Sequence, residues 1–338
     1  MKTRFIVVLC VSILLIPSCN KTSTYDSFAG FVQGTTYSMV FETNGKLNPQ
    51  KLKQDVESIL HDFDMSLSLY ADSSIVSKVN RNENITLDDY FKEAFDKSAQ
   101  ITEMTEGAFD ITVGPLVKAW GFGPDSQKNF TEAKRDSLIK LVGMDKVKIE
   151  NGRLLKDDPG INLDFNAIAQ GYSVDVVSDF FNSKGIKSFL IEIGGEVRVK
   201  GDKKGVLWRI GIDRPEDNNN LPGNDLQAVI SLKDRSLATS GNYRKFYVEN
   251  GIKYSHTIDP RTGYPARNKL LSSTIIAKDC ATADGIATAC MVMGKEKAIE
   301  FLGFHPELDA FLVFSDDSGN YQTWTTENLK RFISQPGN

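Results

Sequence analysis

The sequence predicts an α+β protein with mixed or antiparallel sheets flanked by helices. Strand-like and amphipathic helical runs follow one another without the strict β-α-β alternation of a parallel α/β fold. The 338 residues are 41% hydrophobic and 25% charged, which is ordinary for a globular chain with a large core. No stretch of linker composition divides residues 31–338, so we expect one body there.

Residues 1–18 are a predicted signal peptide. Lys2 and Arg4 precede the apolar run FIVVLCVSILLI, which is too short to span a bilayer comfortably. The following IPSC resembles a lipobox, whose cysteine, here Cys19, is acylated (as with palmitate) and becomes the N-terminus. A plain cleaved signal peptide is the alternative. Residues 19–30 would then tether the body to the periplasmic side of the inner, cytoplasmic membrane.

Charge and cysteine content narrow the partners. Without residues 1–18 the chain has 38 Lys+Arg against 44 Asp+Glu, a net charge of −6, which disfavours binding to nucleic acid. Cys280 and Cys290 remain beyond the anchor. A disulfide between them is allowed outside the cytoplasm, but their apolar and small neighbours favour two buried thiols. The chain has no CxxC or His/Cys cluster of the kind that binds zinc.

The elements of the first half follow from capping residues and periodicity. Residues 35–42 alternate in polarity like a strand. Residues 48–63 predict a helix capped by Asn48. A second helix is expected from about Asp88 to Glu106, stopped by Gly107. Its inward side chains would be Phe91, Phe95, Ala99 and Thr102. Residues 131–143 predict a short helix, and residues 146–156 a hairpin turning at Asn151-Gly152.

The second half is richer in strands. Residues 161–165 (INLDF) predict a buried strand that leads into a helix from about Ala167 to Ser183. Residues 187–201 predict two strands hinged at Gly194-Gly195. The remaining predictions are strands within 208–213, 226–233, 236–241, 245–258, 270–277 and 309–315, and helices within 282–294 and 295–303.

Asp284 and Thr288 form the first candidate site. They lie four residues apart on a predicted helix, so both oxygens point to one side. A carboxylate and a hydroxyl suit a hard cation such as Mg²⁺. The alternative is an acidic residue that favours the helix dipole beside a packed threonine.

Two further segments could bind an anionic or flat ligand. Backbone N–H groups where the helix after Asp164 begins would favour a diphosphate, although a plain capped helix gives the same pattern. In residues 107–123, Phe109, Trp120 and Phe122 could form a slot for a flat ring, with Asp110 on its polar edge. Equally, these aromatic rings could belong to the core.

The stretch SHTIDPRTGYPA, residues 255–266, contains one of three histidines. His256 could accept a proton, and Arg261 could bind phosphate. Alternatively, the stretch is a turn built by Asp259-Pro260 and Thr262-Gly263. His61 and His305 have no evident partners, and we interpret both as structural.

Taken in order, eight segments resemble the ApbE family of bacterial flavin transferases. They are GTTYSMVFE, LSLYADSSIVSKVN, GAFDITVGPLVKAWGFG, LDFNAIAQGYSVD, LIEIGGEVRVKG, LATSGNYRKFY, HTIDPRTGYPA and TADGIATACMVMG. The resemblance implies an ApbE-like, T-fold-type body of two lobes, with FAD between them and Mg²⁺ on its diphosphate. It also fits a lipoprotein anchored at Cys19.

The resemblance assigns roles to single residues. The implied metal ligands are the Ala167 carbonyl, Asp284 and Thr288. The implied flavin contacts are Gln33, Tyr70, Ala108, Phe109, Asp110, Asp164, Gln170 and His256. The sequence departs from the family at Gln170, where many members carry Lys, and at Gln33, where Met is frequent. Glutamine keeps its hydrogen-bonding groups but has no positive charge.

The implied activity is that of an FAD:protein FMN transferase. It would attach FMN from FAD to a threonine or serine of an exported acceptor and release AMP, with His256 as candidate base and Asp284 as catalytic metal ligand. Implied acceptors are subunits of sodium-pumping NADH:quinone reductase or of Rnf-type complexes. The alternatives are a Mg²⁺-dependent FAD pyrophosphatase and a flavin-binding lipoprotein without catalysis.

Overall fold

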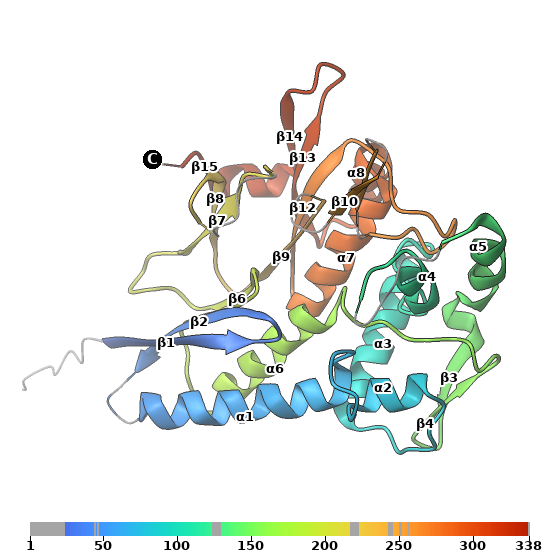
Figure 1. Cartoon of the computed structure of the whole chain (residues 1–338). Helices are drawn as coiled ribbons and strands as arrows, with labels where there is room; N and C mark the ends of the chain where they lie inside the picture. Colours follow the sequence, from blue (N-terminus) through green and yellow to red (C-terminus); the bar gives the residue numbers. More distant parts are fainter. Residues whose placement is uncertain are drawn as a thin grey trace, which may run out of the picture.

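The main sheet runs through the centre of the molecule (Figure 1). The computed structural model describes residues 24–43, 45, 47–123, 130–216, 223–242, 246–249, 252–255 and 257–336. In these residues, eight strands pair antiparallel in the order β1-β2-β5-β6-β9-β12-β13-β14. Their bounds are β1 Thr24–Val32, β2 Thr35–Thr43, β5 Phe189–Ile193, β6 Glu196–Lys200, β9 Ser236–Gly241, β12 Leu270–Ala277, β13 Asp309–Ser315 and β14 Tyr321–Thr325.

A second, smaller sheet covers one face of the main sheet. It has the order β15-β8-β7, with β7 Trp208–Asp213, β8 Leu226–Leu232 and β15 Ile333–Ser334. Its inner residues Ile210 and Ile230 pack with Val199, Leu237 and others of the main sheet. Two separate hairpins complete the strands: β3 Val147–Glu150 with β4 Arg153–Lys156, and β10 Phe246–Glu249 with β11 Ile252–Ser255.

Helices cover the other face. α6 packs on β5 and β6, and α7 on β9 and β12, while α1 and α3 pack outside this pair. The helix bounds are α1 Pro49–Leu67, α2 Ile75–Asn80, α3 Asp89–Met104, α4 Gly114–Ala119, α5 Glu132–Leu138, α6 Ala169–Ser183, α7 Cys280–Met293 and α8 Lys295–Phe304. Antiparallel sheets and covering helices in one body confirm the α+β prediction.

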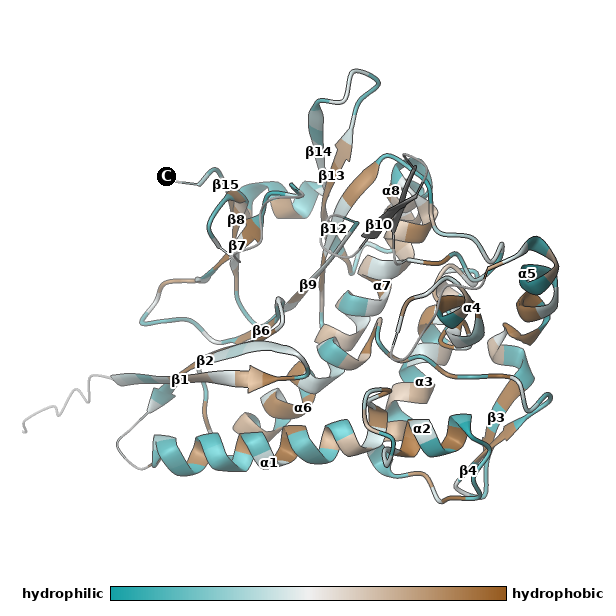
Figure 2. Ribbon diagram, viewed as in Figure 1, coloured by the Kyte–Doolittle hydropathy of each residue, from teal (hydrophilic) through white to brown (hydrophobic). Residues whose placement is uncertain are grey.

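The long helices bury the apolar faces that their periodicity predicts. α1 is hydrophobic on its inner side and hydrophilic outside (Figure 2), and Leu52, Val56 and Leu60 are buried. The Asn48 side chain accepts hydrogen bonds from the N–H groups of residues 50 and 51 and caps α1, as predicted. The buried face of α3 differs in part from the predicted one. Ala94, Ser98 and Ile101 are buried, whereas Ala99 and Thr102, which were expected to point inward, are only half-buried.

Two segments differ from the sequence-based prediction. Residues 24–30, expected in the tether, form most of β1, an edge strand paired along its length with β2. Residues 161–165 are buried but are not a strand, with a single bridge between Asn162 and Val113. Their main chain is satisfied instead by Asn80, whose side chain donates to the Leu163 carbonyl at 2.9 Å and accepts from the Leu163 N–H at 2.8 Å.

Candidate functional site

The site is centred on the contact between α6 and α7. The Asp279 side chain caps α7 by accepting from the Thr282 N–H. From α6, the Asp175 carboxylate accepts from the N–H groups of Cys280 and Ala281 at 2.8–2.9 Å. Asp175 of α6 therefore fixes the first turn of α7. It thereby also fixes the positions of Asp284 and Thr288 along α7 relative to α6.

Asp284 is buried at this contact, with 6% of its surface exposed. Its Oδ2 accepts from the Gly171 N–H at 3.0 Å. Because α6 begins at Ala169 after its N-cap Ile168, the Gly171 N–H is one of the first helical donors, which have no intrahelical acceptor, and Asp284 satisfies it. Burial raises the pKa of Asp284 to about 7, opposed by the Gly171 hydrogen bond.

Glycine at 171 is required by this approach. A Cβ there would lie 2.4 Å from the Cys280 carbonyl oxygen and 2.7 Å from the Asp284 Cβ, closer than such atoms come in proteins. The sequence motif contains this glycine, but only the packing of α6 on α7 shows why it is glycine.

Thr288 follows Asp284 by one helical turn. Its hydroxyl lies 3.0 Å from that of Ser240 on β9. Asp284 and Thr288 thus lie one turn apart on α7, and the bond to Gly171 places Asp284 beside the first turn of α6, which follows Ala167. A buried carboxylate, with no Lys or Arg ion pair among the described residues, fits a divalent cation. The same residues contain no cluster of three or more His, Cys, Asp or Glu.

Asp164 lies just before α6. Its N–H donates to the Ile111 carbonyl at 2.7 Å, and its Oδ1 accepts from the Asn166 N–H at 2.9 Å. Tyr70 is near it, since local desolvation and then the negative charge of Asp164 raise the pKa of Tyr70. Two of the expected flavin contacts are therefore neighbours. At the start of α6 the N–H groups of Ile168 and Ala169 donate to the Phe165 carbonyl, and that of Gly171 donates to Asp284, which leaves the Gln170 N–H for an anionic ligand.

Gln33 at the tip of the β1–β2 hairpin and Gln170 beside the tip of the β5–β6 hairpin both lie near the start of α6. Gln33, with φ of 53° in the β1–β2 turn, donates to Asp64 at 3.1 Å and accepts from Ser173 at 3.3 Å. The Gln170 side chain packs so closely on Gly194 that a Cβ there would lie 2.2 Å from Gln170 Nε2. Both expected contacts thus lie around the first turn of α6.

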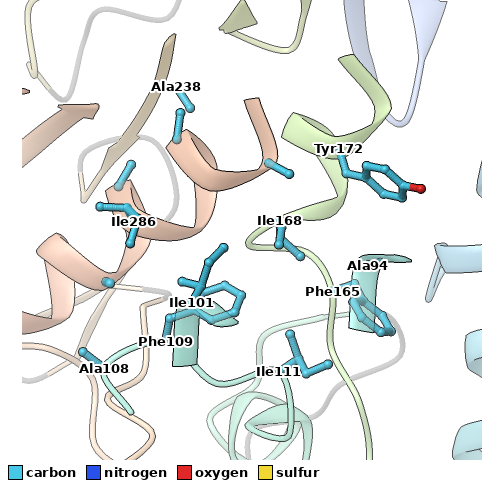
Figure 3. Packing of buried hydrophobic residues seen from close by; sticks show 14 of the residues in the cluster. Ala94, Ile101, Ala108, Phe109, Ile111, Phe165, Ile168, Tyr172, Ala238 and Ile286 are labelled. Carbon is cyan, nitrogen blue, oxygen red and sulfur yellow. The ribbon is translucent and has the colours of Figure 1, made fainter. Parts of the chain in front are cut away.

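Ala108, Phe109 and Asp110 are buried. Phe109 packs with Ile101 and Ile286 under α7 (Figure 3), whereas Trp120 stacks on Phe130 in a separate cluster. Phe109 and Trp120 therefore belong to separate parts of the core. The prediction that they form one slot for a flat ring is wrong. A flavin contact at Ala108 or Phe109 would come from the main chain.

Asp110 holds its own loop in place. Its Oδ1 accepts from the Thr112 N–H and hydroxyl, and its Oδ2 accepts from the Met144 N–H at 3.2 Å. Burial raises the pKa of Asp110, and these hydrogen bonds oppose the rise. The remaining lone pairs of the carboxylate are the part that a ligand could use.

Within the stretch at 255–266, the described residues 258–265 form a turn, as one interpretation predicts. The Asp259 carboxylate accepts from the Arg261 backbone N–H and guanidinium, and the Gly263 carbonyl accepts from the Trp120 indole at 2.8 Å. Arg261 also lies beside Gly107, next to the Ala108–Asp110 segment. His256, the candidate base, lies outside the described residues, as does Cys19.

Cys280 and Cys290 are free and buried. The interpretation as two buried thiols is therefore confirmed. Burial is the largest cause that raises both pKa values, so neither thiol is a nucleophile near neutral pH.

Known proteins are similar to this chain along most of its length. The family model described as the ApbE family matches residues 33–312. An FAD:protein FMN transferase from Vibrio cholerae is 33% identical over 331 residues, which are 96% of this chain and 97% of the relative. One from Escherichia coli K12 is 31% identical, covering 84% of this chain and 82% of the relative.

Two solved structures share the fold. The flavin transferase ApbE of Vibrio cholerae has a TM-score of 0.81 at 32% identity, covering 92% of this chain and 99% of its own. The apo form of the Pseudomonas stutzeri flavinyl transferase ApbE has a TM-score of 0.82 at 32% identity, covering 92% and 97%.

Proposed function

This chain belongs to the ApbE family, and we propose that, as a flavin transferase, it uses Mg²⁺ to move FMN from FAD onto a threonine or serine of an exported acceptor protein. The observation that carries the proposal is the buried Asp284, which is bonded to the Gly171 N–H in the first turn of α6, shortly after Ala167 in the chain. Thr288 adds a hydroxyl one turn away. These are oxygen donors of the kind that Mg²⁺ prefers.

The proposed reaction breaks the phosphoanhydride bond of FAD and forms a phosphoester bond to the acceptor. The acceptor hydroxyl oxygen bonds to the FMN-side phosphorus, the bond to the bridging oxygen breaks, and AMP leaves with that electron pair. His256 is our candidate for the base that takes the hydroxyl proton. When bound, Mg²⁺ would neutralise negative charge on the diphosphate.

The chain's own residues would position the two reactants. The start of α6 would offer the Gln170 N–H and the positive end of the helix dipole to the diphosphate. The hairpin tips at Gln33 and Gly194 border that helix end, and Tyr70 lies near Asp164 in the segment that leads into it. Such positioning supplies much of the rate in phosphoryl-type transfers.

The test is mass spectrometry of candidate acceptors after incubation with FAD and Mg²⁺. We expect the acceptor, a subunit of sodium-pumping NADH:quinone reductase or of an Rnf-type complex, to gain the mass of FMN, with AMP in equal amount. Asp284→Ala, or excess chelator, should reduce labelling at least 100-fold. Free FMN with no labelled acceptor would instead indicate the pyrophosphatase, and FAD bound without AMP release would indicate a plain binder.

The cellular location is part of the proposal. The run at residues 1–18 and Cys19 support a lipid anchor on the periplasmic side of the inner membrane. None of the helices in the described residues is long and apolar enough to cross a membrane. In cells fed labelled palmitate, we expect label on the wild type and none on Cys19→Ser; equal labelling of both would refute the anchor.

A further inference from the structure

The main sheet splits at the β5–β6 turn. β6 and β9 share only two pairs, Arg198 with Ser236 and Val197 with Leu237. Beyond Leu237 the described residues add no further pair, although β9 continues to Gly241 and stays paired with β12 through that residue. The edge of β9 that faces β6 is therefore open over about four residues, or about 13 Å of strand.

A cleft of about 90 Å³ occupies the split. It is lined by Gly194 and Gly195 of the turn, by residues 211–213 of β7, and by Leu237, Thr239 and Gly241 of β9. β7 is itself the outer strand of the small sheet, so a second strand edge borders the cleft. With four glycines among its lining residues, the cleft exposes main chain more than side chains.

The cleft adjoins the candidate metal site through β9. Successive side chains of a strand point to opposite faces. Ser240 points to α7, where its hydroxyl meets Thr288, so Thr239 and Gly241 face the other side and line the cleft. At the other wall, Gly194 packs on Gln170 in the first turn of α6. A segment in this cleft would lie one strand away from the reacting phosphates.

We propose that this cleft binds the acceptor protein, as an extended segment that adds to the open edge of β9 and carries the target hydroxyl toward Thr288. The inference rests on the proposed function, because a protein flavin transferase must hold a polypeptide co-substrate. Open strand edges recognise extended peptides by main-chain hydrogen bonds. Proteins usually cover or charge such edges, which makes one left open inside a cleft informative.

Thr239→Phe tests the proposal by narrowing the cleft. The probe is the purified acceptor subunit of a sodium-pumping NADH:quinone reductase. We expect the KM for this subunit to rise at least tenfold, while the KM for FAD changes less than twofold. Thr274→Val is the matched control. The hydroxyls of Thr239 and Thr274 lie 2.8 Å apart, so either substitution removes this contact, but Thr274 is buried and does not line the cleft. Its KM for the acceptor should stay within twofold of the wild type.

Wild-type enzyme gives a second test that needs no folded variant. A ten-residue peptide covering the flavinylated segment should inhibit labelling of the intact subunit. In an extended peptide, alternate backbone N–H groups point to opposite edges. N-methylation of the amides on the edge that faces β9 should weaken the inhibition at least tenfold, whereas N-methylation of the intervening amides should not. Equal inhibition by both methylated peptides refutes strand addition.

The outcomes separate the two proposals. If wild-type enzyme labels no acceptor, the proposed function fails and takes this inference with it. If the wild type labels the subunit but Thr239→Phe leaves the KM for the subunit unchanged, only the cleft assignment is wrong. A rise in the KM for FAD alone would also overturn it, because the cleft would then bind part of the nucleotide.

Discussion

Gly171→Ala should damage both the stability and the activity of the protein. The new Cβ would lie 2.4 Å from the Cys280 carbonyl oxygen, 2.8 Å from its carbonyl carbon and 2.7 Å from the Asp284 Cβ. None of these atoms can rotate away. Because carbon-oxygen contacts of this kind normally measure about 3.3–3.6 Å, α6 must move by roughly 1 Å. That movement would break the Gly171 hydrogen bond to Asp284.

Three effects set the expected size of the change. Overpacking costs about 1–3 kcal/mol. Loss of a hydrogen bond to a buried carboxylate costs about 1.5–3 kcal/mol. Alanine in a helix interior returns about 1 kcal/mol relative to glycine. The free energy of unfolding, measured by urea denaturation, should therefore fall by about 2–5 kcal/mol. A displacement of 1 Å at the metal ligands should also lower the turnover of the folded fraction about 100-fold.

Gly303→Ala in α8 is the control. A Cβ at position 303 has no atom within 4 Å, so only the helix propensity changes and the variant should be as stable as the wild type or slightly more so. If Gly171→Ala proves as stable as Gly303→Ala, the close contact between α6 and α7 is not as the structure describes it.

Three further predictions follow from other parts of the site. Burial, and then the charge of Asp279, raise the pKa of Asp175 to about 7, so the folded protein binds a proton more tightly than the unfolded chain. Stability should therefore fall as pH rises from about 4 to 7. The urea midpoint of the wild type should be lower at pH 8 than at pH 5.5, and this difference should be smaller in Asp175→Asn. An equal difference in the two proteins would refute this prediction. Ellman's reagent should find no thiol in the native chain after residue 19 and two after denaturation, Cys280 and Cys290; reaction of the native protein would contradict their burial. Gln170→Lys places a positive charge at the start of α6 and should lower the Kd for FAD about tenfold by equilibrium dialysis; an equal or weaker affinity would mean that residue 170 does not face the diphosphate.

Elements specified by local hydrogen bonds were predictable from the sequence. Asn48 and Asp88 cap α1 and α3, and Asn151-Gly152, with positive φ at both residues, turns the β3–β4 hairpin. In each case the deciding partner lies within a few residues along the chain. A single sequence contains that information.

Elements specified by distant partners were not predictable. Residues 161–165 have the composition of a buried strand, but Asn80, 83 residues away, replaces the neighbouring strand for Leu163. Asp175 in α6 looks like any polar residue of an amphipathic helix until α7, 105 residues later, places two N–H groups on it. β1 was mistaken for tether because its pairing with β2 is invisible without the fold.

The same difference between local and distant partners explains how much of the candidate site was predictable from the sequence. The spacing of Asp284 and Thr288 puts both oxygens on one side of a helix, but many helices have such pairs, so spacing left the core interpretation open. The absence of a side chain at Gly171 distinguishes the metal-site interpretation from the core interpretation. A purely structural aspartate could occupy a helix contact that leaves room for a methyl group, whereas at Gly171 even a methyl group is excluded. Burying a carboxylate in this way costs stability unless a cation shares the site. The proposed Mg²⁺ would offset that cost.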